Sequence, residues 1–388
     1  MFGPGRVNWL ARTVSSLALL SIALAACAGP TASPSAGGSP RTSPSASLPG
    51  TTVAGLDKIA VDALSTGGAG LSIAVERRGR IAFSKGYGWA DVENRVPATT
   101  TSIFGLASVT KQFTAAAIMQ MVEQGKFHLD DQLSKVLPEF SDQGPPVTVR
   151  QLLNHTSGIA GYTSFPDYLQ MEPYDQSEQT MLRFIASKPR KFAPGARFGY
   201  SNSGYFLLGL VLERGSGTSY ANHVQKHLFT PVGLRRTEYC RSHPDGRREV
   251  RRYAAGGSPP QAASPVSMTV AFSAGGLCST PEDMLRWQDA LRAGRVVDKA
   301  SYALMTTPTL AGDGQTTPYG FGLEFDPIVA GQTVVWHDGG GPGISSELAY
   351  YPDQDLGNAV LSNADRVSAT EVAKAVGEFL LQTSTAAS

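Results

Sequence analysis

A serine and a lysine three positions apart are the side chains of this sequence best suited to nucleophilic chemistry. In the run Ala107–Thr114 (ASVTKQFT), Ser108 opens a long helical pattern and Lys111 follows on the same helix face. The mostly apolar residues that come next predict a buried helix. A lysine in the first turn of such a helix loses hydration, which favours its neutral form, so it is able to take the proton of the serine hydroxyl.

The position of Ser108 at the start of the pattern suits the same chemistry. The first N–H groups of a helix have no partner within it, and together with the helix dipole they stabilise a developing oxyanion. Taken alone, however, the S-x-x-K motif is weak evidence for a nucleophile, because a serine that caps a helix and is followed by a solvated lysine has the same spacing.

Two further segments carry polar residues at suggestive spacings. Tyr200 and Asn202 lie two apart in the run GYSNSGY, so in an extended loop they point the same way, and a phenol and an amide are able to relay a proton and hold a carbonyl. The alternative is a helix cap before residues 206–212. His337 and Asp338 end an apolar run and are followed by glycines, among them Gly339 and Gly340, which permit close backbone approach. Here the alternative is a glycine-rich turn.

The elements that must position these residues follow from periodicity. Residues 71–77 and 80–86 alternate as a hairpin around Arg78-Gly79, and strand patterns return at 333–336, 345–351 and 358–361. Helical patterns cover 110–123, 179–187, 203–214, 220–227 and 370–381. The expected fold is α/β (α+β), with an antiparallel sheet made from the N- and C-terminal segments, flanked by helices, and a mostly helical inserted lobe. A cleft between the lobes is the natural place for a site.

The three segments together resemble the S-x-x-K, Y-x-N and K/H-x-G motifs of the serine β-lactamase and penicillin-binding-protein-like hydrolase superfamily. The resemblance is strongest to the branch of class C β-lactamases, DD-carboxypeptidases and related esterases. The segments LLNHTSGI (152–159), AGGLCST (274–280) and YGFG (319–322) resemble others of that family, and the likeness runs from about Leu56 to Leu381. It implies one β-lactamase/transpeptidase-like hydrolase domain over 51–388, with a sheet lobe at about 56–107 and 266–382 and a helical lobe at about 108–265.

The resemblance also implies roles for the matched residues. Ser108 is expected to be the acylated nucleophile and Lys111 the group that activates it. Tyr200 is expected to act as the general base and acid that carries the proton to the leaving group. Asn202 is expected to bind a substrate carbonyl or to support Lys111.

The glycine-rich segment completes the implied site. His337 stands where many relatives have lysine and is expected to support Tyr200, while the N–H groups of Ser108 and Gly340 are expected to form the oxyanion hole, with Gly339 beside them. Asp338 departs from the Thr or Ser usual there. An acidic group would repel a substrate carboxylate, and the segment 296–336 holds no Arg and only Lys299 to neutralise it. We therefore expect substrates without a C-terminal carboxylate: esters, or peptides recognised by their amino end.

The expected activity is that of an exported serine hydrolase that cleaves ester or amide bonds in a small-molecule or peptide-like substrate through an acyl-enzyme. The resemblance implies no metal and no organic cofactor. A D-alanyl-D-alanine carboxypeptidase or a β-lactamase is the alternative of the same class. A catalytically weak penicillin-binding or cell-wall interaction protein is the alternative of another class. The oligomeric state is left open.

The N-terminus predicts export. Arg6 and Arg12 precede a short apolar run, too short to span a bilayer, which predicts a signal peptide over 1–26. The run ends Leu-Ala-Ala-Cys27, which resembles a bacterial lipobox and implies lipidation at Cys27. A Ser/Pro-rich tether is expected to extend to residue 50. The expected location is the cell envelope, membrane-anchored and facing outside the cytoplasm; a secreted protein is the alternative.

The remaining features restrict partners without adding chemistry. With 33 basic and 32 acidic residues the net charge is +1, which argues against a nucleic-acid partner. Cys240 and Cys278 form a disulfide or remain two separate buried thiols; spacing does not decide. We interpret His155 as structural and His223 and His227 as a surface helix end rather than metal ligands.

One basic segment is left over. Residues 235–252 carry seven arginines, which indicate either a solvated loop or a surface for an anionic lipid or wall polymer.

Overall fold

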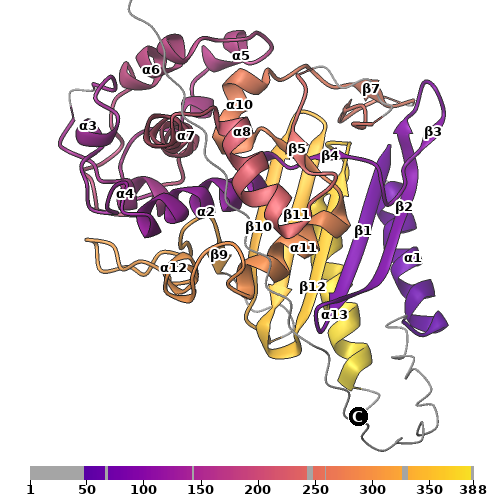
Figure 1. Cartoon of the computed structure of the whole chain (residues 1–388). Coiled ribbons are helices and arrows are strands. Elements are labelled where there is room, and N and C mark those ends of the chain that lie inside the picture. The colour runs from indigo at the N-terminus through magenta and orange to yellow at the C-terminus, as the bar shows by residue number, and fades with distance from the viewer. Residues whose placement is uncertain are drawn as a thin grey trace, which may run out of the picture. The chain divides into compact units, whose positions relative to one another are not determined.

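The structure is a computed structural model that describes residues 48–65, 69–141, 144–242, 248–257, 259–325 and 331–385. The predicted signal peptide, Cys27 and nearly all of the tether lie outside the described residues. Figure 1 shows the arrangement of the elements.

The strands are β1 (Gly70–Arg77), β2 (Arg80–Asp91), β3 (Val96–Pro97), β4 (Phe104–Gly105), β5 (Glu238–Tyr239), β6 (Tyr253–Ala254), β7 (Gln261–Ala262), β8 (Leu277–Ser279), β9 (Glu324–Phe325), β10 (Val335–Gly341), β11 (Ile344–Tyr351) and β12 (Leu356–Ser362). The α-helices are α1 (Gly50–Ser65), α2 (Thr110–Glu123), α3 (Leu133–Val136), α4 (Val149–Leu153), α5 (Tyr168–Met171), α6 (Glu178–Ala186), α7 (Asn202–Ser216), α8 (Tyr220–Val224), α9 (Thr230–Val232), α10 (Met268–Gly275), α11 (Pro281–Arg292), α12 (Lys299–Met305) and α13 (Ala369–Thr385). Short 3₁₀ turns are η1 (Ala107–Val109), η2 (Tyr162–Ser164) and η4 (Pro352–Gln354), and η3 (Gln225–Phe229) is a π-helical turn.

The main sheet joins the two ends of the chain, as predicted. Its seven strands run in the order β3-β2-β1-β12-β11-β10-β9, and every neighbouring pair is antiparallel. The N-terminal and C-terminal strands meet where β1 pairs with β12. Every residue of β12 is buried, because this central strand has both faces covered. A smaller sheet, β4-β8-β5, lies beside the turn that carries Ser108.

Helices cover both faces of the main sheet. On one face, Ile73 and Val75 of β1 share an apolar cluster with residues of α1 and α13. On the other, Ala74 joins a larger cluster that contains α11 and continues into the helical part of the molecule. This alternation along β1 follows from the two-residue period of a strand.

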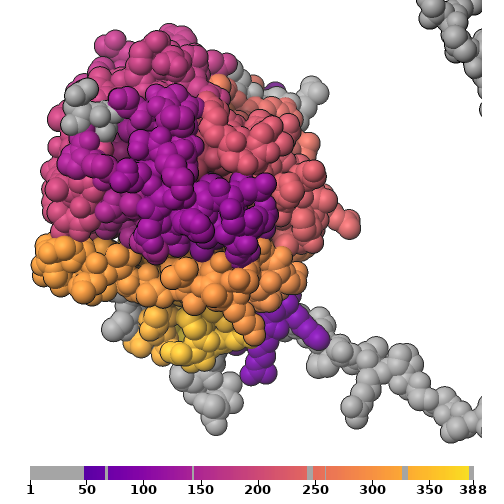
Figure 2. Space-filling model, turned by 60° about the vertical axis from the view of Figure 1, so that its left-hand side comes forward, coloured from indigo at the N-terminus to yellow at the C-terminus, as the bar shows by residue number. Residues whose placement is uncertain are grey.

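The middle of the chain is mostly helical and lies to one side of the sheet, where Figure 1 places α5, α6 and α7. In the space-filling view of Figure 2 these magenta residues stand above a band of orange residues, with the yellow C-terminal residues below. Helices α2 and α7 form the centre of this part, and each is buried over most of its length. A helix that is apolar all round is stable only when its neighbours cover it.

Three elements differ from the predictions. Strand β10 starts at Val335 and continues through the glycines to Gly341, so the run after His337 is strand rather than a glycine-rich turn. The single helix predicted over 220–227 is α8 followed by the π-helical turn η3. Ser108 lies in η1, one 3₁₀ turn before α2 begins at Thr110. The division of the chain into a sheet lobe and a helical lobe stays a prediction. Helix α10, which lies in the range predicted for the sheet lobe, packs on α7 and α2 of the helical part.

Candidate active site

Ser108 is held on a strained turn at the junction of the two parts of the fold. The preceding residue, Ala107, has φ +42°, in the left-handed region that non-glycine residues rarely adopt. Strain of this kind costs on the order of 1–3 kcal/mol and persists only where the surroundings fix it. Here Leu106 N donates to Leu277 O of β8 at 2.8 Å, and Ser346 Oγ of β11 donates to Leu106 O at 2.7 Å.

Lys111 is fully buried and its nitrogen has three close oxygens. Nζ lies 2.9 Å from Ser108 Oγ, 2.8 Å from Asn202 Oδ1 and 2.8 Å from Ala274 O. Ala274 is at the C-terminal end of α10, where a helix leaves its carbonyls without an internal partner. The two carbonyls accept two N–H donors, which leaves the third position facing the hydroxyl of Ser108.

The protonation state of Lys111 makes this third position chemically useful. Burial lowers the pKa of Lys111 to about 7, and the carboxylates of Asp338 and Glu324 act in the opposite direction. The neutral amine is therefore accessible near neutral pH, and its nitrogen lies within hydrogen-bond distance of the Ser108 hydroxyl. The geometry that the S-x-x-K spacing predicted is present.

Tyr200 lies on the other side of the nucleophile. Burial raises the pKa of its phenol well above the usual value, and a hydrogen bond with the Ser108 side chain acts in the opposite direction. Lys111 Nζ stands 4.9 Å from the centre of the Tyr200 ring. A neutral phenol beside both groups is placed to pass a proton between them and a leaving group.

Sequence alone left His155 with only a structural role, and the structure shows what that role is. Its Nδ1 accepts a hydrogen bond from Ser201 N at 3.1 Å, and its ring packs on Tyr200 with centroids 4.4 Å apart. Burial lowers the pKa of His155 well below the usual value, so it stays neutral. It fixes the loop that presents Tyr200 and Asn202.

Asn202 is the first residue of α7, directly after the capping residue Ser201. Its Oδ1 accepts from Lys111, and its Nδ2 donates to Thr163 Oγ1 at 3.0 Å. Of the two roles expected for Asn202, the structure therefore displays support of Lys111. Thr163, which orients the amide, belongs to no motif that the sequence analysis used.

Strand β10 forms the opposite wall of the site. A Cβ on Gly339 would stand 2.2 Å from Leu106 O and 2.9 Å from Ser108 N, so only glycine lets the strand pass this close to the nucleophile. Gly340 is exposed and lines the same pocket as Ser108. This placement is what an oxyanion hole built from the two N–H groups requires.

His337 is brought near Tyr200 without a hydrogen bond to it among the described residues. The two ring centres are 6.4 Å apart. His337 Nδ1 donates to Asp338 O at 2.6 Å, so Nε2 accepts from the Tyr319 hydroxyl at 2.8 Å. Burial lowers the pKa of His337 to about 3, so it carries no charge at neutral pH. Any support it gives Tyr200 passes through packing with Tyr319, which also lies against Tyr200.

Asp338 is half-buried and is not among the residues that line the Ser108 pocket. Burial raises its pKa, and the charge that opposes this is Lys111 rather than any residue of the segment 296–336. Ligand atoms of Glu324, His337 and Asp338 lie within 4.8 Å of one another, which is the geometry of a potential cation site. His337 Nε2, however, already accepts a hydrogen bond from the Tyr319 hydroxyl, so its lone pair is not available to a cation.

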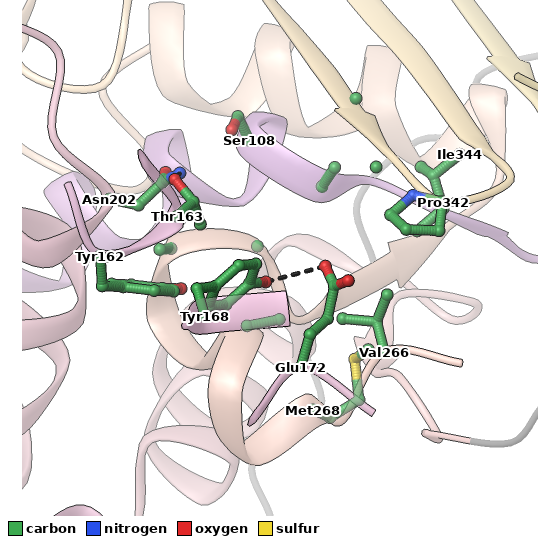
Figure 3. A pocket seen from close by; sticks show the side chains of 16 residues that line it. Ser108, Tyr162, Thr163, Tyr168, Glu172, Asn202, Val266, Met268, Pro342 and Ile344 are labelled. Carbon is green, nitrogen blue, oxygen red and sulfur yellow. Dashed lines mark hydrogen bonds between the residues drawn. The ribbon is translucent and has the colours of Figure 1, made fainter. Parts of the chain in front are cut away.

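Ser108 opens into a pocket of about 260 Å³ (Figure 3). Asn202 and Thr163 lie at one side of it, Pro342 and Ile344 at the other, and Glu172 faces the space between. The other lining residues are Ala107, Tyr162, Tyr168, Val266, Met268, Ala271, Ala274, Gly275, Gly340 and Gly341. Among these described lining residues Glu172 alone has a charged side chain, and Tyr168 Oη donates to it at 2.9 Å.

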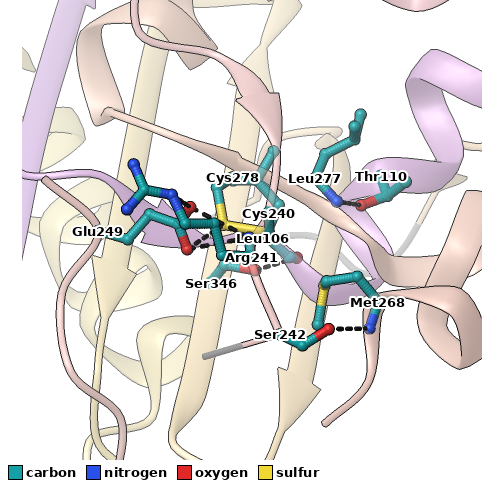
Figure 4. Close-up of a disulfide and its surroundings, with 10 residues drawn as sticks. All are labelled: Leu106, Thr110, Cys240, Arg241, Ser242, Glu249, Met268, Leu277, Cys278 and Ser346. Atoms are coloured by element: carbon teal, nitrogen blue, oxygen red, sulfur yellow. Dashed lines mark hydrogen bonds and ion pairs between the residues drawn. A yellow bond between two sulfur atoms is a disulfide. The ribbon is translucent and has the colours of Figure 1, made fainter. Parts of the chain in front are cut away.

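The two cysteines that spacing left undecided form a disulfide, with their Cα atoms 5.2 Å apart. Figure 4 shows it beside Leu106 and Ser346. Cys278 pairs in register with Gly105, and Cys240 N donates to Gly276 O at 2.8 Å. The bond therefore ties the 240 segment to the small sheet behind Ser108.

The prediction of a surface helix end is wrong for His223, which is buried, whereas His227 is exposed. Their ring centres lie 4.5 Å apart. No Cys, Asp or Glu among the described residues joins them as a potential metal ligand.

Comparisons with known proteins show the family and the fold to which the chain is similar. A model of the Beta-lactamase family matches residues 56–381. Penicillin-binding protein 4* of Bacillus subtilis (strain 168) is 30% identical over 302 residues, 74% of this chain and 66% of that protein. D-aminopeptidase of Gluconobacter oxydans (strain 621H) is 27% identical over 314 residues, 79% of this chain and 58% of that protein.

Among solved structures, D-amino acid amidase from Ochrobactrum anthropi SV3, complexed with L-phenylalanine amide, superposes with a TM-score of 0.74 at 25% identity. The match covers 86% of this chain and 99% of that one. By contrast, the chain spans about three fifths to two thirds of the length of the two sequence relatives named above.

Proposed function

This chain belongs to the Beta-lactamase family and is a serine hydrolase, and on that premise we propose that it forms an acyl-enzyme at Ser108 and cleaves ester or amide bonds in small or peptide-like substrates. One observation carries the proposal: burial lowers the pKa of Lys111 to about 7, and its Nζ lies 2.9 Å from Ser108 Oγ. An amine in that place is a general base for the hydroxyl.

The reaction follows from the positions of these groups. Neutral Lys111 takes the Ser108 proton as Oγ attacks the carbonyl carbon, and the N–H groups of Ser108 and Gly340 receive the negative oxygen. Tyr200 passes a proton to the leaving amine or alcohol as its bond to carbon breaks, which leaves the acyl-enzyme. The Lys111 ammonium returns a proton to Tyr200, so that both groups regain their starting forms. Water then adds to the ester carbon and gives a proton to neutral Lys111. The bond to Ser108 Oγ breaks, Oγ takes that proton back, and the carboxylic acid product leaves.

The charge of the pocket supports a substrate class. Glu172, its one charged lining residue among those described, attracts a cation and repels a carboxylate. We therefore propose substrates that present a free amino group beside the scissile bond, in line with the substrates named for the D-aminopeptidase and the D-amino acid amidase relatives. The Asp338 departure points in the same direction.

A substrate panel tests the activity. D- and L-aminoacyl p-nitroanilides, their N-acetylated forms, short-chain p-nitrophenyl esters, D-Ala-D-Ala peptides and nitrocefin are compared, with Ser108→Ala as the blank. We expect the free aminoacyl substrates to be turned over fastest. Faster turnover of D-Ala-D-Ala or nitrocefin would favour the carboxypeptidase or the β-lactamase instead, and a penicillin label that never leaves Ser108 would favour a binding protein.

Glu172→Gln tests the amino-end part separately. We expect it to lower the ratio of kcat/KM for a free aminoacyl anilide over its N-acetylated form about tenfold, since a charged hydrogen bond is lost. Glu178→Gln is the matched control, because Glu178 is half-exposed, pairs with Arg214 at 2.8 Å and lies outside the pocket. An unchanged ratio in Glu172→Gln contradicts this assignment.

We also propose export and anchoring through a lipidated Cys27. The apolar run before Cys27 supports this, and so does the Cys240–Cys278 disulfide, since such bonds persist outside the cytoplasm. Within the described part of the chain, no helix has the length and apolar character needed to cross a bilayer. Cys27→Ser is expected to move the protein from the membrane fraction to the soluble fraction and to abolish acyl labelling; unchanged membrane partition would contradict the anchor.

A further inference from the structure

A second pocket adjoins the one that holds Ser108. It has a volume of about 190 Å³ and is lined by Ser242, Arg251, Arg252 and residues 262–265. Pro265 lines this pocket and Val266, the next residue, lines the Ser108 pocket. On the other side, a Cβ on Gly343 would lie 2.5 Å from Arg252 Cβ, and Gly343 stands between Pro342 and Ile344 of the Ser108 pocket. The segments that line the two pockets are therefore adjacent at these two places.

Arg252 is a buried cation whose guanidinium makes no hydrogen bond or ion pair with the part of the chain that the structure describes. Its residue is 8% exposed, and its Nη1 is buried with no hydrogen-bond partner among the described residues. No described carboxylate lies within 4.0 Å of its guanidinium nitrogens. Burial of an unpaired charge costs several kcal/mol. Because Arg252 also lines the second pocket, an anion bound there would offset part of this cost.

The neighbouring carboxylates do not satisfy this guanidinium, because each pairs with a different arginine. Asp91 Oδ2 lies 3.0 Å from Arg251 Nε. Glu249 accepts from Arg241 N at 3.1 Å and lies 3.5 Å from Arg241 Nε. Burial lowers the pKa of Arg252, and Glu249 is the charge that opposes this shift. A guanidinium nonetheless stays protonated in proteins, so Arg252 retains its charge.

The backbone that carries the two arginines is held rigidly in place. Arg251 N donates to Ala90 O at 2.9 Å, and Ala263 N donates to Arg252 O at 2.9 Å. Tyr253 N donates to Asn363 O at 2.8 Å, and Asn363 Nδ2 donates to Arg251 O at 2.8 Å. Such a site needs little reorganisation when a ligand enters.

We propose that Arg252, assisted by Arg251, binds an anionic oxygen group, a carboxylate or a phosphate, carried on the distal end of the substrate that acylates Ser108. This rests on the proposed function and deepens it. A guanidinium offers a planar fork of donors that matches either group. The two pockets together then select a substrate with a cationic group near Glu172 and an anionic group in the pocket lined by Arg252.

The test compares anionic and neutral esters. Two series of phenyl esters are made, one with a carboxylate on the acyl chain and one with a carboxylate on the leaving group, each with its methyl-ester partner and several chain lengths. For wild type we expect kcat/KM for the anionic ester to exceed that for the neutral ester in one of the two series. The difference should be largest at one chain length. Arg252→Gln is expected to lower this ratio at least tenfold, and Arg252→Lys to retain part of it.

Arg248→Gln is the matched control. Arg248 lies in the same basic segment, but its side chain is 55% exposed, pairs with Glu238 at 2.7 Å and lines neither pocket. It is expected to leave both the neutral-ester rate and the ratio unchanged. A ratio that is unchanged in Arg252→Gln, or that falls equally in Arg248→Gln, overturns the proposal.

A binding measurement keeps the site separate from catalysis. Calorimetry with glutarate and with inorganic phosphate is performed on Ser108→Ala protein with and without Arg252→Gln, after thermal melting has shown that both are folded. Glutarate binding that Arg252→Gln removes supports the anion site even if neither ester is hydrolysed. Absence of hydrolysis together with such binding would contradict the proposed function but not the anion site. Phosphate binding that leaves anionic-ester turnover uninhibited overturns the substrate assignment and makes the ligand a free anion. No binding of either anion overturns the site.

Discussion

Lys111 and Arg252 are both buried cations beside neighbouring pockets, and burial affects them differently. Lys111 has three oxygens within 2.9 Å and a pKa lowered to about 7. Arg252 has an Nη1 with no partner among the described residues. An amine responds to burial by losing its proton, whereas a guanidinium cannot do so under ordinary conditions.

The difference shows how one force produces two functions. At Lys111, desolvation creates a base, and the two carbonyl acceptors direct its lone pair towards Ser108. At Arg252, desolvation leaves a charge with which no described carboxylate forms an ion pair, and an anionic ligand would neutralise it. The exchange of one cation type for the other should therefore destroy the first site and weaken the second, because a lysine buried at position 252 would lose part of its charge.

The largest expected effect is that of Lys111→Arg. An arginine at this position keeps the positive charge but has no accessible neutral form, so Ser108 loses its base. We expect kcat/KM on a neutral ester to fall by about 10³-fold, within the range for loss of a general base. Near-ultraviolet circular dichroism checks that the variant is folded; an activity within tenfold of wild type would mean that charge rather than basicity matters.

Removal of the disulfide tests the support that the two regions share. Cys240 and Cys278 are 38 residues apart, and closing such a loop stabilises the fold by about 2–4 kcal/mol. The double variant Cys240→Ala/Cys278→Ala is expected to lose this amount in urea unfolding, and dithiothreitol should destabilise wild type but not the variant. Equal stability of the two proteins would show that the small sheet holds these segments unaided.

The smallest expected effect is electrostatic and should appear at one cation only. Asp338 raises the pKa of Lys111, so Asp338→Asn should move the acid limb of kcat/KM to lower pH by roughly half a unit. Arg248→Gln, on the exposed part of the basic segment, should leave the limb in place. A limb that moves upward in Asp338→Asn would contradict the assigned sign.

The sequence predicts the parts of this site that are side chains at fixed spacing. Ser108 and Lys111 meet because they are one helical turn apart, and Tyr200 and Asn202 lie on either side of Ser201, the residue that caps α7. The third partner of Lys111 is the carbonyl of Ala274, a backbone group that no side-chain pattern reports. The main sheet could be predicted from the strand patterns at both ends of the chain. The continuation of β10 through three glycines could not, because glycine weakens the interior of a strand.

Tertiary contacts decide what spacing cannot. Arg251 and Arg252 are adjacent in a segment of seven arginines, and only the pairing of the 250–253 backbone with its neighbours turns Arg252 inward. The bond between Cys240 and Cys278 likewise depends on a Cα separation that the small sheet sets. Glu172 enters the pocket from a short helical segment without any motif.

The pH dependence of kcat/KM on an uncharged ester tests the central claim most directly. With such a substrate the acid limb reports the free enzyme, and the claim is that Lys111 must lose its proton before Ser108 reacts. We predict that kcat/KM rises with pH to half its maximum near pH 7 and is then level until the phenol of Tyr200 titrates. A profile that is flat from pH 5, or that rises only towards the pKa of an exposed lysine near 10.4, would contradict it.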